Sequence, residues 1–207
     1  MVQYIVPVET IESGTWEDFT TPAQDLYTRI DQGILGGSED TSQRIKETND
    51  TPQSGEFLLG TPSSTPDVDT GHIVRVVAQN NVFFQDKILY FDLIQGSTTI
   101  ATGSVTLPGN EGSPSFVTGV MSVTEAEAGN ITNYADLRVS LLSDTNASDQ
   151  LYVAEVEMEL PDGGGGGGSA VSDFIRFENG CMSDFRGMVN IIMVVLLREL
   201  VVLFTEE

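Results

Sequence analysis

The chain has 207 residues, 40% of them hydrophobic, and its 31 acidic side chains outnumber its 9 basic ones to give a net charge of −22 at pH 7. This charge repels nucleic-acid phosphates and anionic lipids, so we expect no nucleic-acid partner and consider membrane binding disfavoured. With one cysteine and one histidine, the chain cannot form an intrachain disulfide or an ordinary zinc site, and we predict neither metal nor cofactor.

Residues 1–70 are predicted to be an irregular region that packs on a sandwich core. Gly, Ser, Thr, Asp and Pro are frequent from residue 31 to residue 70, which predicts long loops with short strands such as Glu56–Leu59 between them. The stretch Asp67–Gly71 begins like a calcium loop, but its glycine comes one position early. An ordinary turn is therefore the expected structure there.

Residues 71–162 are predicted to form the core of an antiparallel β-sandwich or jelly roll. Strand-like segments are separated by turn signals such as Gln95–Gly96–Ser97, and no helix-length segment lies between them. This spacing favours an antiparallel sandwich over a parallel sheet. The six segments are HIVRVVAQ, KILYFDLIQ, TTIATGSVTL, SFVTGVMSV, ADLRVSLL and QLYVAEVEMEL.

Two of these segments alternate clearly between apolar and polar residues. In ADLRVSLL, the apolar positions Leu137, Val139 and Leu141 are expected to share a buried face. In QLYVAEVEMEL, the face carrying Tyr152, Ala154, Val156, Met158 and Leu160 is expected to be buried, and the face carrying Val153, Glu155, Glu157 and Glu159 to be wet.

The aromatic residues Trp16, Tyr90 and Tyr152 are interpreted as core packing rather than as a platform for a sugar. A short helix is expected where Thr124 precedes Glu127 by three residues, which is the spacing of a capping box, and Gly129 ends it. We expect this helix to connect two strands.

The C-terminal part has a different character. Residues 163–170 begin with six glycines, Gly163 to Gly168, and are predicted to be a flexible linker spanning roughly 15–20 Å. Residues 171–207 are predicted to be an apolar attachment segment, in which the run from Met188 to Glu207 contains no Gly or Pro. Charged residues at Arg198 and Glu199 argue against a membrane span, and a helix is favoured over two buried strands.

A helix that is apolar on nearly all sides must be buried in its own domain, in sister chains or in another protein. We predict that this segment attaches or oligomerises the chain, giving a homo-oligomer for which a trimer is one arrangement. The side chains expected to form the interface are Ile191, Val194, Val195, Leu197, Leu200, Val201, Leu203 and Phe204.

No pattern in the sequence indicates catalysis. The glycine run is not followed by the Gly-Lys-Ser/Thr of a nucleotide loop. Cys181 and His72 are far apart, without a triad pattern around either. The 31 acidic residues do not reveal which two would converge for glycoside hydrolysis. We therefore predict that the protein is not an enzyme.

A set of motifs lies between about residue 15 and residue 162, namely Trp16, LYTRID, HIVR, LIQGSTTIAT, VTEAEAGNITNYADLRV and AEVEMELPD. These motifs resemble those of a group of tailed-bacteriophage virion proteins common in marine phages. The crossover VTEAEAGNITNYADLRV is the most specific of them, with Asn133 where the group has Asp, and the chain from Gly163 onward departs from the group.

The resemblance implies a β-sandwich that forms part of a virion, such as a capsid decoration or cement protein, a head fibre or an appendage. The expected location is the exterior surface of the phage particle, and the expected partners are other copies of the chain and the major capsid protein or another virion protein. The alternative is a host-receptor or carbohydrate-binding module of a tail fibre or neck appendage, reading host glycans with its loops.

Overall fold

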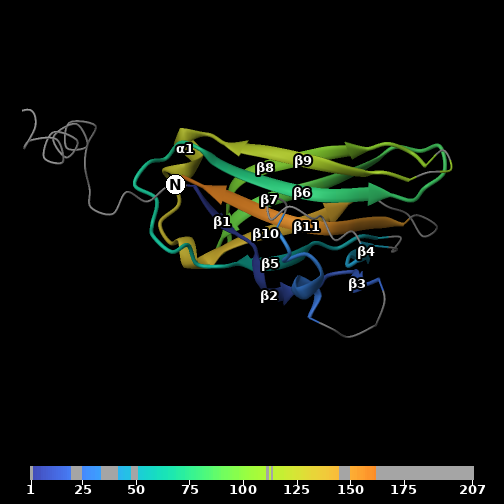
Figure 1. Ribbon diagram of the computed structural model, residues 1–207, viewed down its shortest axis with the longest axis horizontal. Coiled ribbons are helices and arrows are strands. Elements are labelled where there is room, and N and C mark those ends of the chain that lie inside the picture. The colour runs from blue at the N-terminus through green and yellow to red at the C-terminus, as the bar shows by residue number, and fades with distance from the viewer. Residues whose placement is uncertain are drawn as a thin grey trace, which may run out of the picture. The chain divides into compact units, whose positions relative to one another are not determined.

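The structure is a computed structural model that describes residues 2–19, 25–33, 42–47, 51–110, 112, 114–144 and 150–161. These residues form two antiparallel sheets that pack face to face as a β-sandwich (Figure 1). They belong to a compact unit that ends at Gly163.

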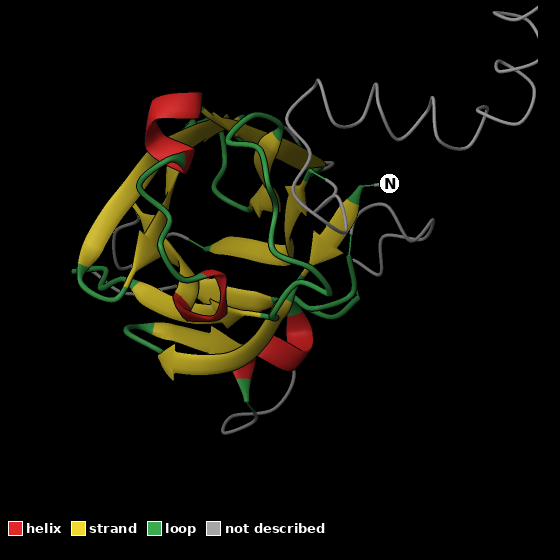
Figure 2. Ribbon diagram, turned by 90° about the vertical axis from the view of Figure 1, so that its left-hand side faces the viewer, coloured by secondary structure: helices red, strands yellow, loops and turns green. Residues whose placement is uncertain are grey.

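One sheet has six strands in the order β3-β4-β11-β6-β9, with β1 also paired to β11. The other has five strands in the order β2-β5-β10-β7-β8. Figure 2 shows the strands of both sheets surrounding the space that the core side chains fill. The bounds are β1 Gln3–Ile5, β2 Pro7–Glu12, β3 Trp16–Asp18, β4 Ile45–Glu47, β5 Gly55–Leu59, β6 His72–Asn80, β7 Lys87–Gln95, β8 Thr98–Leu107, β9 Phe116–Val123, β10 Leu137–Ser143 and β11 Leu151–Leu160.

The predicted all-β fold is confirmed, and the six expected segments form β6 to β11. The expected crossover helix is α1, Glu125–Ala128, which follows β9. Its capping box is present, since the Thr124 hydroxyl and the Glu127 carboxylate each accept a hydrogen bond from the backbone of the other. Short 3-10 helices occur at η1, Leu26–Arg29, and η3, Tyr134–Asp136.

The N-terminal region contains the short strand expected at Glu56–Leu59, which is β5, but it also supplies β1 to β4 and so is a larger part of the two sheets than expected. One edge of β11 is completed by β4 near its start and by β1 near its end. Between them, the Val156 N–H donates a hydrogen bond to the Ile30 carbonyl at 3.0 Å. Backbone groups of a buried strand need partners on both edges, and these N-terminal segments provide them.

The wet acidic face predicted for β11 is wrong, since Glu155 and Glu157 are 0% and 1% exposed. A register shift between Val153 and Glu155 reverses the alternation, so Leu151 and Val153 join Val156 in the core. The opposite face is covered by the N-terminal segment, whose Gly33 lies against the Glu157 carboxylate. Arg75 of β6 also forms ion pairs with Glu157 and Glu159 on that face.

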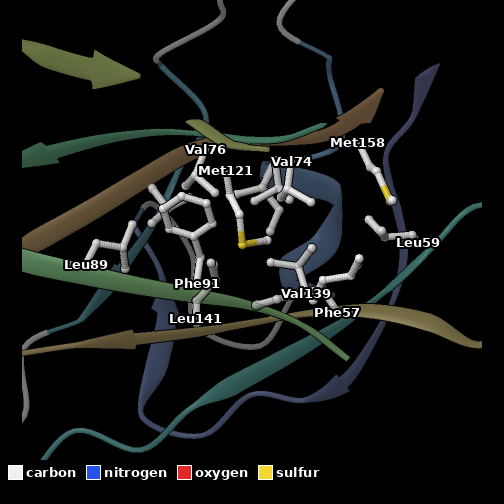
Figure 3. Packing of buried hydrophobic residues seen from close by; sticks show 14 of the residues in the cluster. Phe57, Leu59, Val74, Val76, Leu89, Phe91, Met121, Val139, Leu141 and Met158 are labelled. Carbon is white, nitrogen blue, oxygen red and sulfur yellow. The ribbon is translucent and has the colours of Figure 1, made fainter. Parts of the chain in front are cut away.

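The core lies between the sheets, where apolar side chains from both inner faces meet (Figure 3). Phe57 and Phe91 come from the five-stranded sheet, and Met121 and Met158 come from the six-stranded sheet. Each fully buried side chain of this size stabilises the fold by about 1.5–3 kcal/mol. As predicted, Leu137, Val139 and Leu141 all face this core.

Predictions for the glycine linker and the attachment segment lie outside the described residues, as do Cys181 and the eight proposed interface side chains. Within the described ranges, no helix is both long and apolar enough to cross a membrane.

Candidate functional site

The candidate site lies on the outer face of the five-stranded sheet, and β7 is its central strand. Side chains alternate along β7, so Leu89, Phe91 and Leu93 point into the core. Tyr90 and Asp92 therefore point outward, side by side on the same face. Two residues along a strand are separated by about 7 Å.

Pairing with the neighbouring strands places three small polar side chains and one leucine next to these two residues. Tyr90 lies between Ser104 of β8 and Leu142 of β10. Asp92 lies between Thr102 of β8 and Ser140 of β10 in the next row. Directly paired residues share a face of the sheet, so both rows are exposed on the same side.

A groove of about 550 Å³ occupies this part of the sheet. The tyrosine and leucine side chains are partly exposed, Tyr90 at 42% and Leu142 at 38%. They form an apolar wall, while hydroxyl and carboxyl groups form a polar one. The groove is lined by Tyr90, Asp92, Thr102, Gly103, Ser104 and Leu142.

Gly103 allows β8 to lie close to the core beneath the groove. A Cβ atom at this position would come within 3.0 Å of the Met121 side chain and of the Phe91 ring. The absence of a side chain is therefore required by packing on the inner side of the strand. On the outer side, the Gly103 backbone N–H forms a hydrogen bond with Asp92.

Among the described residues, Asp92 is the only acidic one that lines the groove. Partial burial raises the pKa of its carboxyl group, and the hydrogen bond from the Gly103 backbone offsets part of that rise. Among the described residues, no cation forms an ion pair with Asp92. Its carboxylate is therefore available to a ligand.

The nearest cationic side chain on this face, Arg138 of β10, has other partners. Its guanidinium lies 3.0 Å from the Asp136 carboxylate and 3.4 Å from the Glu56 carboxylate. The hydrogen bond with Asp136 is the main cause of the raised pKa of Arg138. With one guanidinium and two carboxylates, this cluster keeps a net negative charge and leaves the charge of Asp92 in place.

The groove combines polar and apolar groups. Its described lining contains one carboxyl group, the hydroxyls of Thr102, Ser104 and Tyr90, and no histidine, cysteine or lysine. An aromatic ring next to hydroxyls and a carboxylate suits a ligand with an apolar face and several hydroxyl groups.

The interpretation of Tyr90 as a core residue is wrong, because its side chain is half exposed and lines the groove. Trp16 is buried in the core as predicted, whereas Tyr152 is buried outside the core cluster, because Leu151 and Val153 on either side of it face the core. The Trp16 indole donates a hydrogen bond to the Leu141 carbonyl at 3.1 Å, and the Tyr152 ring is covered by Arg44 and Phe19. The alternation along KILYFDLIQ, with Phe91 inward, is the signal that would have placed Tyr90 and Asp92 outward together.

The other residues considered from the sequence do not form a site. His72 is buried, and its Nε2 atom lies 2.7 Å from the Tyr134 hydroxyl. Asp67 and Asp69 lie in an exposed turn before Gly71. In the described part of the chain, no cluster of three or more His, Cys, Asp or Glu residues could hold a metal ion.

No protein-family model matches the sequence, and no curated protein matches it either. Among solved structures, TmCBM61 in complex with β-1,4-galactotriose is similar at 9% identity and a TM-score of 0.35, over 57% of this chain and 70% of that one. A family 29 carbohydrate-binding module from Piromyces equi, CBM29_1, is similar at 12% identity and a TM-score of 0.34, over 77% of this chain and 91% of that one. A CBM4 structure is similar at 8% identity and a TM-score of 0.30, over 52% of this chain and 71% of that one. These values are too low to support a functional inference.

Proposed function

We propose that the protein is a non-catalytic binding protein that takes a carbohydrate in the groove on the outer face of its five-stranded sheet. The observation that supports this most is that Tyr90 and Asp92 lie next to each other on the outer face of β7. An exposed aromatic ring there adjoins a carboxylate that has no cationic partner among the described residues. This corresponds to the alternative prediction from the sequence, although the ligand would be bound by the sheet rather than by the loops.

A sugar can contact both the apolar wall and the polar wall of the groove. The apolar C–H face of a pyranose packs on an aromatic ring, as it would on Tyr90 beside Leu142. Its hydroxyl groups donate to a carboxylate and exchange hydrogen bonds with hydroxyls, as they would with Asp92, Thr102 and Ser104.

Other small-molecule classes fit less well. A purely apolar ligand would bury the Asp92 carboxylate without a hydrogen bond, which is costly. A phosphorylated ligand would meet a chain of net charge −22 with no free cation among the described lining residues.

The test is binding of the full chain to a printed glycan array, followed by calorimetry with the oligosaccharide that binds best. Tyr90→Ala should abolish binding or weaken it by at least tenfold, because it removes the apolar wall. Tyr4→Ala is the matched control, since Tyr4 is 46% exposed on β1 of the other sheet. Equal affinities for both variants would refute the location of the site, and a folded chain that binds no glycan would refute the function.

The predicted role in a phage virion remains a separate proposal. It depends on attachment through residues 171–207, on homo-oligomerisation and on a capsid-side partner, none of which the described residues address. A domain that binds host glycans and one that is displayed on a particle are compatible, because display requires only that the outer sheet face remain free.

A further inference from the structure

We infer that the groove selects its ligand by charge, so that an amino sugar binds more tightly than its neutral N-acetylated counterpart and a uronic acid is excluded. This inference rests on the proposed carbohydrate-binding function and names the class of sugar. It follows from the charges that the sheet places around Asp92 and from the aromatic ring beside it.

The outer face of the five-stranded sheet is predominantly acidic along the row that includes Asp92. The row continues from Asp92 through Ser140 to Glu56 on β5, and from there to Glu12 on β2. Glu9 lies in the adjacent row, opposite Leu58.

The single cation described on this face cannot balance these charges. Arg138 already bridges Asp136 and Glu56. Two carboxylates share that one guanidinium, so the cluster keeps a net negative charge. The carboxylates of Asp92, Glu12 and Glu9 add to this excess on the same face. An anionic sugar would be repelled from it, and a cationic one would be attracted.

Asp92 and Tyr90 together form a suitable site for one ammonium group. The Gly103 backbone N–H occupies part of the hydrogen-bonding capacity of the Asp92 carboxylate, which lines the groove and can accept further hydrogen bonds. Hydrogen bonds between an ammonium and a carboxylate are roughly twice as strong as those between neutral groups. The neighbouring Tyr90 ring adds attraction, because its face is negative and a cation within about 6 Å of it is stabilised.

The experiment compares matched sugars on the full-length protein. The array carries oligosaccharides of glucosamine, galactosamine and mannosamine in two forms, with a free 2-amino group and with a 2-acetamido group, and it includes oligogalacturonate. We expect at least one free-amine form to bind roughly tenfold more tightly than its acetylated partner at neutral pH and low salt. This ratio should fall toward one in Asp92→Asn and as salt rises, and oligogalacturonate should not bind.

The outcomes separate this inference from the proposed function. If acetylated or other neutral sugars bind and the amines bind no better, the charge selection is wrong while carbohydrate binding stands. If the amine preference persists unchanged in Asp92→Asn, the assignment to Asp92 is wrong. If oligogalacturonate binds as well as the neutral sugars, the exclusion of acids is wrong. If no sugar of any class binds the folded chain, both proposals fail.

Discussion

Replacing Asp92 with Asn should make the protein more stable and a weaker binder, and these opposite effects test the structural reasoning most directly. The side chains have nearly the same shape, so the change removes charge and leaves packing in place. Asp92 has a raised pKa because it is partly buried, and among the described residues it has no ion-pair partner. A carboxylate in that position destabilises the fold whenever it is ionised.

The sign of the pH dependence follows from the direction of the shift. A carboxyl whose folded-state pKa lies above its ordinary value of 3.8 binds a proton more tightly in the folded state. Its destabilising effect is therefore present at neutral pH, declines as the pH falls through the raised pKa and vanishes below the ordinary value. The Asn variant should gain free energy of unfolding at pH 7 and lose that advantage in acid.

The effect on binding can be estimated from the hydrogen bonds available. A hydrogen bond to a charged group contributes about 1.5–3 kcal/mol and one to a neutral group about 0.5–1.5 kcal/mol. The Gly103 backbone already bonds part of the Asp92 carboxylate. We therefore take Asp92 to accept one hydrogen bond from the ligand. Exchanging it for a neutral bond costs about 1–1.5 kcal/mol, or roughly 5- to 15-fold in Kd for a neutral sugar.

Urea unfolding at several pH values measures the first effect, and calorimetry measures the second. Asp136→Asn is the matched control, because Asp136 pairs with Arg138 at 3.0 Å and its loss should lower stability by no more than about 1 kcal/mol. If Asp92→Asn is less stable than the wild type at pH 7, Asp92 has a stabilising partner and the reasoning is wrong.

Three further predictions concern the fold and the remainder of the chain. Gly119→Ala should destabilise by about 1–3 kcal/mol in urea unfolding, because its Cβ would lie 2.9 Å from both the Cβ and the Cγ1 of Val105; the same cost in a Val105→Gly background, which removes both atoms, would contradict this cause. Phe84→Gly should stabilise by up to about 1 kcal/mol, since Phe84 has a φ of 57° and is 72% exposed; a lower melting temperature would show that packing on Phe83 outweighs the backbone strain. A chain ending at Asp162 should remain folded, because the compact unit ends at Gly163; light scattering that finds an oligomer for the full chain and a monomer for the shorter one would support the attachment role, and two equal monomers would contradict it.

The central strands could be predicted because their signal is local. In β10, Leu137, Val139 and Leu141 alternate with more exposed residues, and such a pattern determines both strand and face. The strands β3 and β4 have three residues each, which is too short for a period to be recognised. The strand β4 forms because β11, more than 100 residues away, offers it an unpaired edge, and β3 in turn pairs with β4.

The same limit explains the error in β11. The alternation in β11 was genuine, but the register shift after Val153 and the covering N-terminal segment are long-range features. The outward position of Tyr90, by contrast, follows from its own strand, in which Tyr90 and Asp92 alternate with the buried residues of β7. Only the neighbours of Tyr90 are a long-range feature, since they depend on the register with β8 and β10.

The groove and the core are built by opposite faces of β7, and this arrangement determines which substitutions affect which property. Phe91 packs inward, where an added Cβ at Gly103 or Gly119 would come within 3.0 Å or 3.1 Å of its ring. Asp92 points outward and bonds the backbone of the same Gly103. The position of β8, and with it the floor of the groove, is therefore set by packing in the core. Substitutions at either glycine should disturb stability and binding together, whereas substitutions at Tyr90 should change binding alone.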